Sequence, residues 1–299
     1  MKRLAFLIAG SVLALQSCKE KAPYIQLTPE PAKSDSISVV SPVPAAEPHN
    51  VLIEDFTGAS CPNCPAAHDI IKGIATIYIG RVNVIGLHIA GFPQASPTKH
   101  GKYDFRTQLA ADMSNSIFQG VSSAPIGGID RQPLGTSSTT PLLISTSSWN
   151  ATVIGRMTVS DSINLSVTST FDDATGKARI KATVTYLYPM TTVQNLSLVV
   201  VEDSFVDEQE DNRIPITYLD TEYHFNDVLR GFVTAAPFGD AIAPTRTTKE
   251  AGLRYEVTYN YDVDPTWKPK NCRLIAFVHT NQSNGGKNVY QSKQVKMKL

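Results

Sequence analysis

The motif Cys61-Pro62-Asn63-Cys64 lies between an apolar run, Val51–Phe56, and a stretch with helical periodicity, Ala66–Ile79. A C-x-x-C pair at a strand-to-helix junction is typical of a thiol–disulfide redox site. The unpaired N–H groups and positive dipole end of a helix N-terminus favour a thiolate over a thiol. A cysteine placed there is therefore reactive. The motif predicts a strand–loop–helix unit, and it leaves open whether the chain performs redox chemistry or only keeps the scaffold.

Residues 1–17 have the pattern of a secretory signal peptide and are excluded from the fold. Met1-Lys2-Arg3 is basic, and Leu4–Leu15 is apolar but too short to span a bilayer as a helix. The segment ends in Leu15-Gln16-Ser17-Cys18, which resembles a bacterial lipobox. Cleavage there would leave Cys18 as an N-terminal residue whose acyl chains anchor the protein in a membrane. The alternative is an ordinary signal peptide with a chance cysteine.

Residues 18–48 are predicted to be a tether, because they are rich in Pro, Ser and Ala and poor in large apolar side chains. Lys19, and not Asp, follows the cysteine, which by resemblance to enterobacterial sorting rules provides no retention in the inner membrane. Lys+Arg and Asp+Glu number 27 each, so no net charge attracts the chain to nucleic acid. We expect contact with the membrane through Cys18 and no nucleic-acid partner.

Residues 49–160 are predicted to form one domain with helices and strands. The strand Val51–Phe56 and the helix Ala66–Ile79 are followed by an apolar run, Val82–Ile89, typical of a strand buried on both faces of a mixed sheet. Such a strand–helix–strand unit makes a right-handed crossover. A second helix is expected over Tyr103–Phe118, where apolar residues recur every four positions. These patterns predict an α/β fold.

A second motif, Val121–Pro125 followed by residues 126–131, resembles the cis-proline loop and hairpin of thioredoxin-like proteins. In those proteins the loop lies beside the C-x-x-C pair. The resemblance implies that Pro125 is the cis residue and that the backbone of Ala124 binds an extended substrate next to Cys61. The alternative is that Pro125 only turns the chain.

Asp55 stands six residues before Cys61, where thioredoxins carry a buried aspartate. By that resemblance its carboxylate takes the proton of the resolving thiol, Cys64; the alternative is that Asp55 faces solvent. Thioredoxin's Trp before the first cysteine is Ser60 here, and its Gly-Pro dipeptide is Pro62-Asn63. Pro62 and Asn63 are expected to border the substrate. Neither residue carries a charge, so a lowered pKa of the Cys61 thiol must come from the helix N-terminus.

The remaining His and Cys residues indicate no metal or cofactor. Cys61, Cys64, His68 and His88 could together form a zinc site, but one C-x-x-C without a second close pair is weak evidence for a metal. Cys272 precedes an apolar run and is expected to be a buried, inert thiol.

Residues 161–299 change to alternating polar and apolar residues. Runs at 163–167 and 178–184 flank a Gly-bearing turn and predict a hairpin, and residues 284–286 are expected to form the turn of a second hairpin. Further strands are predicted at 196–201, 254–261, 274–279 and 289–295. Several short strands with such joints predict an antiparallel, immunoglobulin-like β-sandwich. Residues 208–238 are predicted to be a long irregular loop, whose aromatic residues form either a binding surface or a small core.

The layout resembles the Omp28 family of outer-membrane lipoproteins of Bacteroidetes. The matching stretches are Glu54-Asp55-Phe56-Thr57-Gly58, Cys61-Pro62-Asn63-Cys64-Pro65-Ala66, Leu87-His88, Ser123-Ala124-Pro125, His224–Gly231 and Val289-Tyr290-Gln291. The resemblance implies an α/β thioredoxin-like domain followed by an all-β domain. It also implies an outer-membrane location, facing the periplasm or the cell surface, and no established reaction.

Two hypotheses of different classes follow. In the first, the protein is a thiol–disulfide oxidoreductase acting on a protein dithiol or disulfide. Cys61 attacks, Cys64 resolves, Asp55 relays the proton, and Pro125 orients the substrate. In the second, Cys61–Cys64 is a structural disulfide, and the protein is a binding or structural lipoprotein that acts through its β-domain, whose ligand the sequence does not identify.

Overall fold

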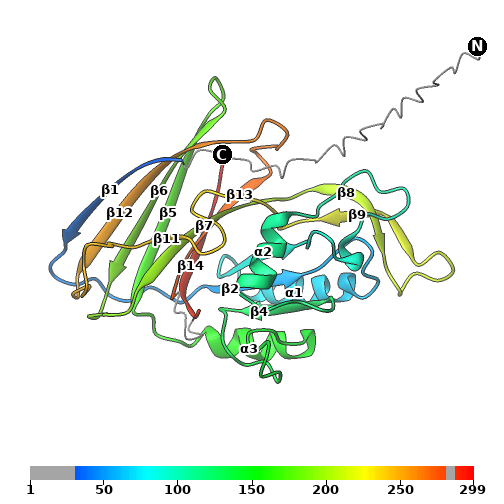
Figure 1. The fold of residues 1–299 in the computed structure, drawn as a ribbon, viewed down its shortest axis with the longest axis horizontal. Coiled ribbons are helices and arrows are strands. Elements are labelled where there is room, and N and C mark those ends of the chain that lie inside the picture. The colour runs from blue at the N-terminus through cyan, green and yellow to red at the C-terminus, as the bar shows by residue number, and fades with distance from the viewer. Residues whose placement is uncertain (1–30, 281–286) are drawn as a thin grey trace, which may run out of the picture.

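The computed structural model describes residues 31–280 and 287–299, which are mostly β with few helices (Figure 1). The strands are β1 (Ala32–Val39), β2 (Val51–Phe56), β3 (Val82–Leu87), β4 (Ile126–Ile129), β5 (Ile163–Asp172), β6 (Lys177–Tyr186), β7 (Gln194–Glu202), β8 (Phe205–Glu210), β9 (Leu219–Phe225), β10 (Val228–Phe232), β11 (Asp240–Ala241), β12 (Leu253–Asp262), β13 (Cys272–Thr280) and β14 (Val289–Lys296). The helices are α1 (Cys64–Ile77), α2 (Gln108–Ser116) and α3 (Trp149–Arg156), with short 3-10 turns η1 (Pro93–Ala95) and η2 (Thr146–Ser148). None of the described helices is long and apolar enough to cross a membrane. The predicted signal peptide, Cys18 and the predicted turn at 284–286 lie outside the described residues.

A large mixed sheet runs through the molecule in the order β14-β13-β7-β10-β3-β2-β4, with β11 beside β7 (Figure 1). β2 and β10 both pair with β3 in parallel, and the other neighbours are antiparallel. Strands from both sides of the predicted boundary at residue 160 therefore hydrogen-bond within one sheet. The sequence does not show that these strands form one sheet, because β3 and β10 pair although they are far apart in the chain.

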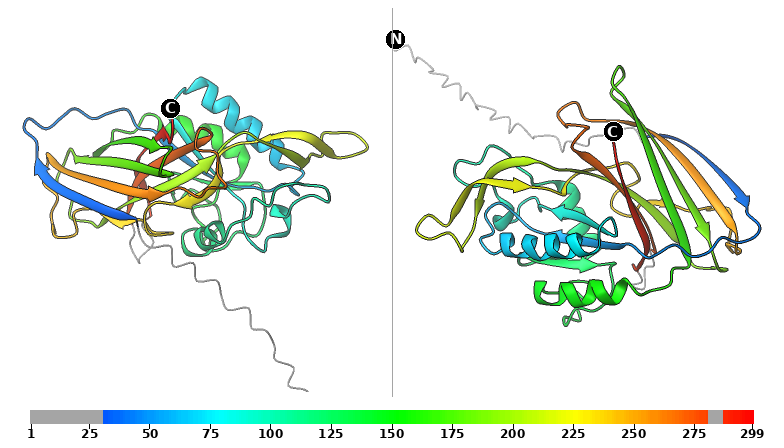
Figure 2. Two further views of the ribbon diagram at one scale, coloured as in Figure 1. Left: turned by 90° about the horizontal axis from the view of Figure 1, so that it is seen from above. Right: turned by 180° about the vertical axis from the view of Figure 1, so that it is seen from behind.

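A second, antiparallel sheet has the order β1-β12-β6-β5. It forms one end of the molecule, opposite the helices (Figure 2). Apolar side chains of its strands share one buried cluster with those of β7 and β13. β1 lies inside the predicted tether, so the structure differs from that prediction over residues 32–39. The segment between Pro31 and Pro42 contains no proline, and β12 pairs with it from Ala32 to Val39.

About half of the predicted irregular loop at 208–238 is instead ordered as strands, so that prediction is wrong for the end of β8, for β9 and for β10. β8 and β9 form a hairpin that projects from the helical end of the molecule (Figure 2), and β10 enters the large sheet. Phe205, Asp207 and Gln209 are buried in alternation along β8. Two of these three buried side chains are polar. The alternation of buried and exposed residues along β8 therefore does not show as an alternation of apolar and polar residues in the sequence.

The helices cover both faces of the parallel strands. Val51 and Ile53 of β2 pack with Ile71 and Ile74 of α1, whereas Leu52 and Phe56 point to the other face and pack in the cluster that includes α2. α2 is shorter than the predicted helix at 103–118, because Thr107 caps it by accepting a hydrogen bond from the Ala110 N–H. This alternation places Asp55 on the face that α1 covers.

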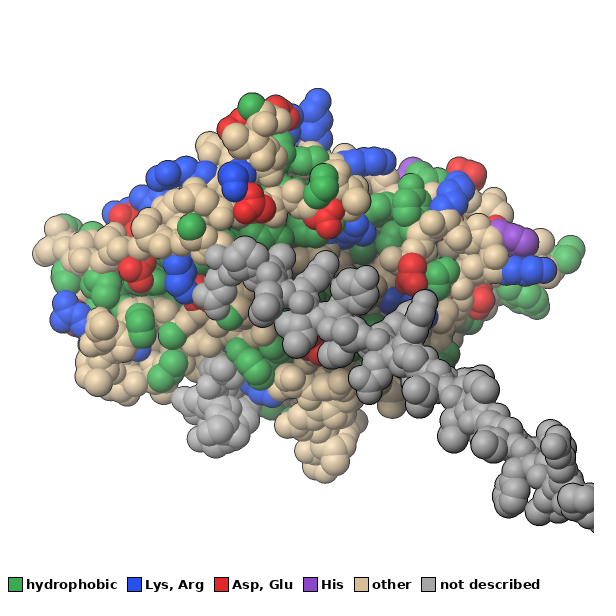
Figure 3. Space-filling view, turned by 45° about the horizontal axis from the view of Figure 1, so that its top comes forward, with side chains coloured by type: hydrophobic (Ala, Val, Ile, Leu, Met, Phe, Trp, Pro, Cys, Tyr) green, Lys and Arg blue, Asp and Glu red, His purple; other side chains and the backbone are tan. Residues whose placement is uncertain are grey.

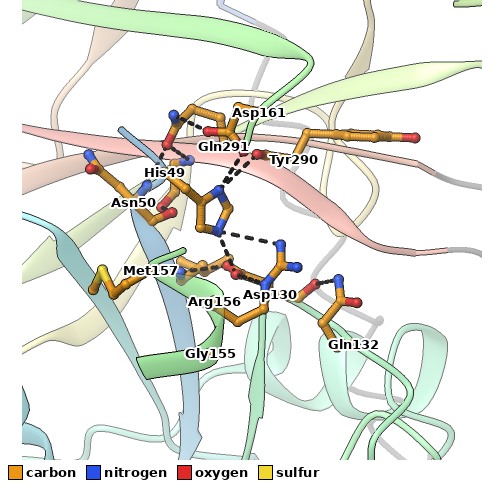
Figure 4. Close-up of polar contacts among 12 residues, drawn as sticks. His49, Asn50, Asp130, Gln132, Gly155, Arg156, Met157, Asp161, Tyr290 and Gln291 are labelled. Carbon is orange, nitrogen blue, oxygen red and sulfur yellow. Dashed lines mark hydrogen bonds and ion pairs between the residues drawn. The ribbon is translucent and has the colours of Figure 1, made fainter. Parts of the chain in front are cut away.

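A buried polar cluster joins the segments before β2, after β4 and before β5 (Figure 4). His49 Nδ1 lies 2.7 Å from Asp161 Oδ1, and its Nε2 lies 2.7 Å from Asp130 Oδ2. Arg156 of α3 donates to the same Asp130 oxygen at 2.7 Å, and the Gln291 amide donates to Asp161. Burial lowers the pKa of His49, but the hydrogen bonds to Asp130 and Asp161 outweigh it and raise the pKa to about 9. His49 is therefore an imidazolium cation paired with two carboxylates at neutral pH.

Candidate functional site

Cys61 and Cys64 form a disulfide at the start of α1, with their Cα atoms 5.4 Å apart. Because α1 begins at Cys64, the unpaired N–H groups and positive dipole end of the helix lie at the pair. Both cysteines have an exposed fraction of 0%. Pro62 between them is half-buried, whereas Asn63 is exposed. The strand, loop and helix predicted around the motif are thus present, and the pair is inaccessible to solvent in this conformation.

Ala124 and the side chain of Phe92 pack against the two cysteines. The peptide bond between Ala124 and Pro125 is cis, as predicted. β4 follows at Ile126 and pairs with β2 next to the C-x-x-C loop. The structure therefore brings Ala124 and Pro125 to the disulfide, although they lie some sixty residues away in the sequence.

The turn η1 covers one side of the site through Gln94. The Gln94 amide accepts from the Ala124 N–H at 2.9 Å and donates to the Ala124 carbonyl at 3.2 Å, so both backbone groups of Ala124 are occupied. The turn also packs closely against Gly58, where an added Cβ would lie 2.2 Å from the backbone carbonyl oxygen of Gln94. Only glycine at position 58 allows this close approach.

Residues 209–212 cover another side by binding the backbone of the C-x-x-C loop. The buried Gln209 amide donates to the carbonyls of Gly58 at 3.2 Å and Cys61 at 3.1 Å. The N–H groups of Glu210 and Asn212 donate to the carbonyls of Ala59 and Pro62 at 2.8 and 3.0 Å. We call residues 92–95 and 209–212 together the cover. Gln94 and Gln209 have no sequence signal, because an isolated glutamine carries no motif.

Asp55 lies on the strand beneath the first turn of α1 and is 2% exposed, so it does not face solvent. Its Oδ2 atom lies 3.2 Å from His68 Nε2, and its buried Oδ1 atom has no hydrogen-bond partner among the described residues. His68 Nε2 also lies 2.9 Å from the Thr57 hydroxyl, and His68 Nδ1 lies 2.6 Å from the Tyr223 hydroxyl. We call Asp55, Thr57, His68 and Tyr223 the Asp55 cluster.

His88 follows β3 and is buried among the rings of Phe105 and Phe225. Within the described part of the chain, neither of its ring nitrogens has a hydrogen-bond partner. Burial, and to a smaller extent the charge of His68, lowers the pKa of His88 to about 3. His88 is therefore neutral at physiological pH. Residues 31–280 and 287–299 contain no group of three or more His, Cys, Asp or Glu side chains arranged to hold a metal ion.

Cys272 is the third cysteine of the described residues and lies at the start of β13, fully buried. Burial, and then the charge of Glu202, raises the pKa of its thiol to about 12. Such a thiol carries almost no thiolate at neutral pH, so Cys272 is not a competing nucleophile.

Comparison with known protein families identifies the family of this chain. The pattern of the family described as outer membrane protein Omp28 matches residues 113–298, which is more than half of the chain. The chain belongs to the Omp28 family. The match includes Ala124 and Pro125 of this Omp28-family chain but begins after the cysteine pair, so the C-x-x-C motif lies outside it.

Among solved structures, HBP35 of Porphyromonas gingivalis is similar to this Omp28-family chain with a TM-score of 0.62 and 15% identity. The similarity covers 85% of this chain and 77% of that one, and at this identity it shows the fold alone. A protein from Agrobacterium tumefaciens is similar with a TM-score of 0.48 and 11% identity over 85% of this chain and 96% of its own. No curated protein matches the chain significantly.

Cationic and anionic side chains are mixed on the face seen in Figure 3, with hydrophobic side chains scattered between them. No broad single-sign patch is visible on this face, which agrees with the equal totals of Lys+Arg and Asp+Glu. The groups with specific chemistry that the structure assembles are therefore those around the disulfide and the Asp55 cluster.

Proposed function

We propose that this Omp28-family protein is a thiol–disulfide oxidoreductase with a thioredoxin-like N-terminal part and a β-sandwich C-terminal part. It is held at the outer membrane by acyl chains on Cys18, and its substrates are protein dithiols or disulfides. The observation that carries the proposal is the position of the Cys61–Cys64 disulfide, at the N-terminus of α1 and against the backbone of Ala124. A helix N-terminus favours the thiolate that exchange requires.

In the reducing direction, the Cys61 thiolate attacks one sulfur of a substrate disulfide and releases the other as a thiolate. Cys64 then attacks the Cys61 sulfur of the mixed disulfide. The Cys61–Cys64 bond forms, the bond to the substrate breaks, and two electrons pass to the substrate. The Cys64 thiol loses its proton to the Asp55 carboxylate, whose buried Oδ1 atom has no hydrogen-bond partner in residues 31–280 and 287–299. The oxidising direction is the reverse of these steps.

The cover must open before a protein substrate reaches the cysteines, since both have an exposed fraction of 0%. Gln94 occupies the Ala124 N–H and carbonyl, the two groups that would pair with the backbone of an extended substrate. A substrate segment that pairs with Ala124 would replace these two hydrogen bonds, so displacement of Gln94 costs little net hydrogen-bond energy.

A second function is favoured by the same burial. The four hydrogen bonds from Gln209, Glu210 and Asn212 tie the C-x-x-C loop to β8 and the residues after it. A disulfide enclosed in this way also suits a purely structural bond, in a lipoprotein that binds its partner through the β-rich part.

The reduction potential of Cys61–Cys64 separates the two functions. It is measured in redox buffers on the full chain carrying Cys272→Ser, which leaves only the pair within the folded part. A potential between about −270 and −120 mV places the pair among exchange enzymes, whereas a potential below about −300 mV is that of a structural bond and ends the redox proposal.

A further inference from the structure

The Asp55 carboxylate is buried, yet the proposed exchange requires it to gain and lose one proton in each cycle. Its exposed fraction is 2%, and its Oδ1 atom has no hydrogen-bond partner among the described residues. A buried carboxylic acid cannot pass its proton directly to bulk water, so it needs a neighbour that reaches solvent. His68 is that neighbour, because its Nε2 atom lies 3.2 Å from Asp55 Oδ2 and its side chain is 25% exposed.

The position of His68 follows from the helix. His68 is four residues after Cys64 on α1, so its side chain lies on the same face of the helix as the resolving cysteine. The turn of α1 that begins at Cys64 thus places a titratable ring over the strand carboxylate. An imidazole ring can accept a proton at one nitrogen and release a proton from the other, as a relay requires.

The partners of the ring allow proton passage in either tautomer. Nε2 lies 2.9 Å from the Thr57 hydroxyl, and Nδ1 lies 2.6 Å from the Tyr223 hydroxyl. A hydroxyl can donate or accept, so neither contact fixes the proton on one nitrogen. Burial, and then the charges of Asp69 and Asp55, raises the pKa of Tyr223 above its ordinary value, which keeps its hydroxyl neutral. Tyr223 therefore orients the ring and does not compete for the charge.

The other titratable groups near this site are occupied or neutral. Asp69 pairs with Arg213, and Asp227 pairs with Arg273. His88 is fully buried, with no hydrogen-bond partner for its ring nitrogens among the described residues. His68 is therefore the group placed to exchange a proton with both Asp55 and solvent.

We infer that His68 carries the proton between the buried Asp55 carboxylate and solvent when the cysteine pair passes between dithiol and disulfide. This inference rests on the proposed function. On disulfide formation the Cys64 thiol gives its proton to Asp55 Oδ1. The Asp55 carboxyl group then turns so that this proton faces His68 and passes to Nε2, and the imidazolium releases its Nδ1 proton to water when the contact between Nδ1 and the Tyr223 hydroxyl opens. One proton leaves for each disulfide formed, and His68 acts through Asp55 without touching sulfur.

The test follows two signals while reduced full-length protein, carrying Cys272→Ser, reacts with an aromatic disulfide in stopped flow. Attack by Cys61 releases the first aromatic thiolate, and closure by Cys64 releases the second together with one proton. A pH indicator in weak buffer records that proton. In the parent protein we expect proton release to coincide with the second thiolate. In His68→Gln, which keeps an amide donor but cannot carry a proton, we expect proton release to lag by at least about tenfold.

Two further variants keep the result specific. In His68→Ala, added imidazole should restore fast proton release, which a merely structural role of His68 would not produce. Tyr223→Phe is the matched control, because it removes the partner of Nδ1 but leaves the titrating ring, and it should shift proton release by less than about threefold. Coincident proton and thiolate signals in His68→Gln would overturn the relay while leaving the redox function intact. Absence of both thiolate phases in the parent protein would overturn the relay and the proposed function together.

Discussion

Two buried clusters each place a histidine beside a carboxylate, and they differ in how completely their polar atoms are paired. In the His49 cluster, both ring nitrogens face carboxylates, and Arg156 and Gln291 bind the same two acids (Figure 4). In the Asp55 cluster, one oxygen of Asp55 has no partner among the described residues, and the histidine is partly exposed. Native interiors rarely leave a buried polar atom unpaired without a reason.

The difference separates a cluster that stabilises the fold from one suited to chemistry. His49 links the segments before β2, after β4 and before β5, and both of its ring nitrogens are held by buried carboxylates. In the Asp55 cluster, Asp55 Oδ1 has no hydrogen-bond partner within the described ranges, and Oδ2 contacts the partly exposed ring of His68. Full pairing favours rigidity, whereas an unpaired acceptor is available for a reacting proton.

The largest effect is expected from His49→Leu. This change leaves Asp130 and Asp161 buried without their shared cation, and breaking a buried ion pair costs about 3–5 kcal/mol. The free energy of unfolding, measured by urea denaturation of the oxidised protein, should fall by that amount. The reduction potential of Cys61–Cys64 should stay unchanged. A loss below about 1 kcal/mol would show that the His49 cluster does not stabilise the fold.

Stability should also depend on pH through His49. Its pKa of about 9 in the folded state lies above the ordinary value of 6.5, so folding favours the protonated form. The stabilisation is fully present below about pH 6.5 and is lost as the pH rises through about 9, by up to roughly 3 kcal/mol. Urea titrations at intervals from pH 6 to 9.5 measure this slope. His49→Gln should be flatter over the same range, and parallel slopes for the two proteins would contradict the assignment.

Asp55→Asn should act on rate more than on stability. The amide keeps the shape of the side chain but cannot take a proton from Cys64, so disulfide closure should slow by about a hundredfold. The free energy of unfolding should change by less than about 1 kcal/mol, since one oxygen of Asp55 has no hydrogen-bond partner to lose in the part of the chain that the structure describes. Stopped-flow release of the second aromatic thiolate measures closure.

Asp130→Asn is the matched control for Asp55→Asn, because it makes the same chemical change in the His49 cluster. It should destabilise the fold and leave the rate of closure unaltered. Equal effects of the two substitutions on rate, or on stability, would remove the distinction between the clusters.

The local patterns in the sequence were enough to predict β2, β3, β5 to β7 and β12 to β14, together with α1, the cis bond before Pro125 and the placement of the cysteine pair. Those features depend on periodicity and on short motifs. The single sheet through β3 and β10 was not predictable, because period-two alternation shows which face of a strand is buried but not which strand lies beside it. β8 was missed for a related reason, since its buried residues include Asp207 and Gln209, which are polar.

Five residues of the candidate site were named from the sequence: Cys61, Cys64, Ala124, Pro125 and Asp55. The burial of Asp55 was an open alternative until the structure placed it beneath α1. The contact of His68 with Asp55 and the contact of Gln94 with Ala124 were not found from the sequence. Each contact joins segments that are well separated in the sequence, and neither residue type carries a motif at that spacing.

The smallest effect is expected from Gln94→Ala, which tests whether the cover limits access to the disulfide. The change removes two hydrogen bonds to Ala124, each worth about 1 kcal/mol net, so the cover should open more often. Reduction of Cys61–Cys64 by dithiothreitol, followed by thiol alkylation and mass spectrometry, should accelerate by roughly thirtyfold.

Gln108→Ala is the matched control for Gln94→Ala, because it removes a glutamine contact of similar length, to Asp112, outside the cover. It should leave the rate of reduction unchanged. Gly58→Ala should accelerate reduction by a different route, since the added Cβ would lie 2.2 Å from the Gln94 carbonyl oxygen and 2.3 Å from the Ala95 Cα. An unchanged rate in both cover variants would mean that η1 does not control the site. Opening would then have to come from residues 209–212, whose hydrogen bonds hold the backbone of the C-x-x-C loop itself.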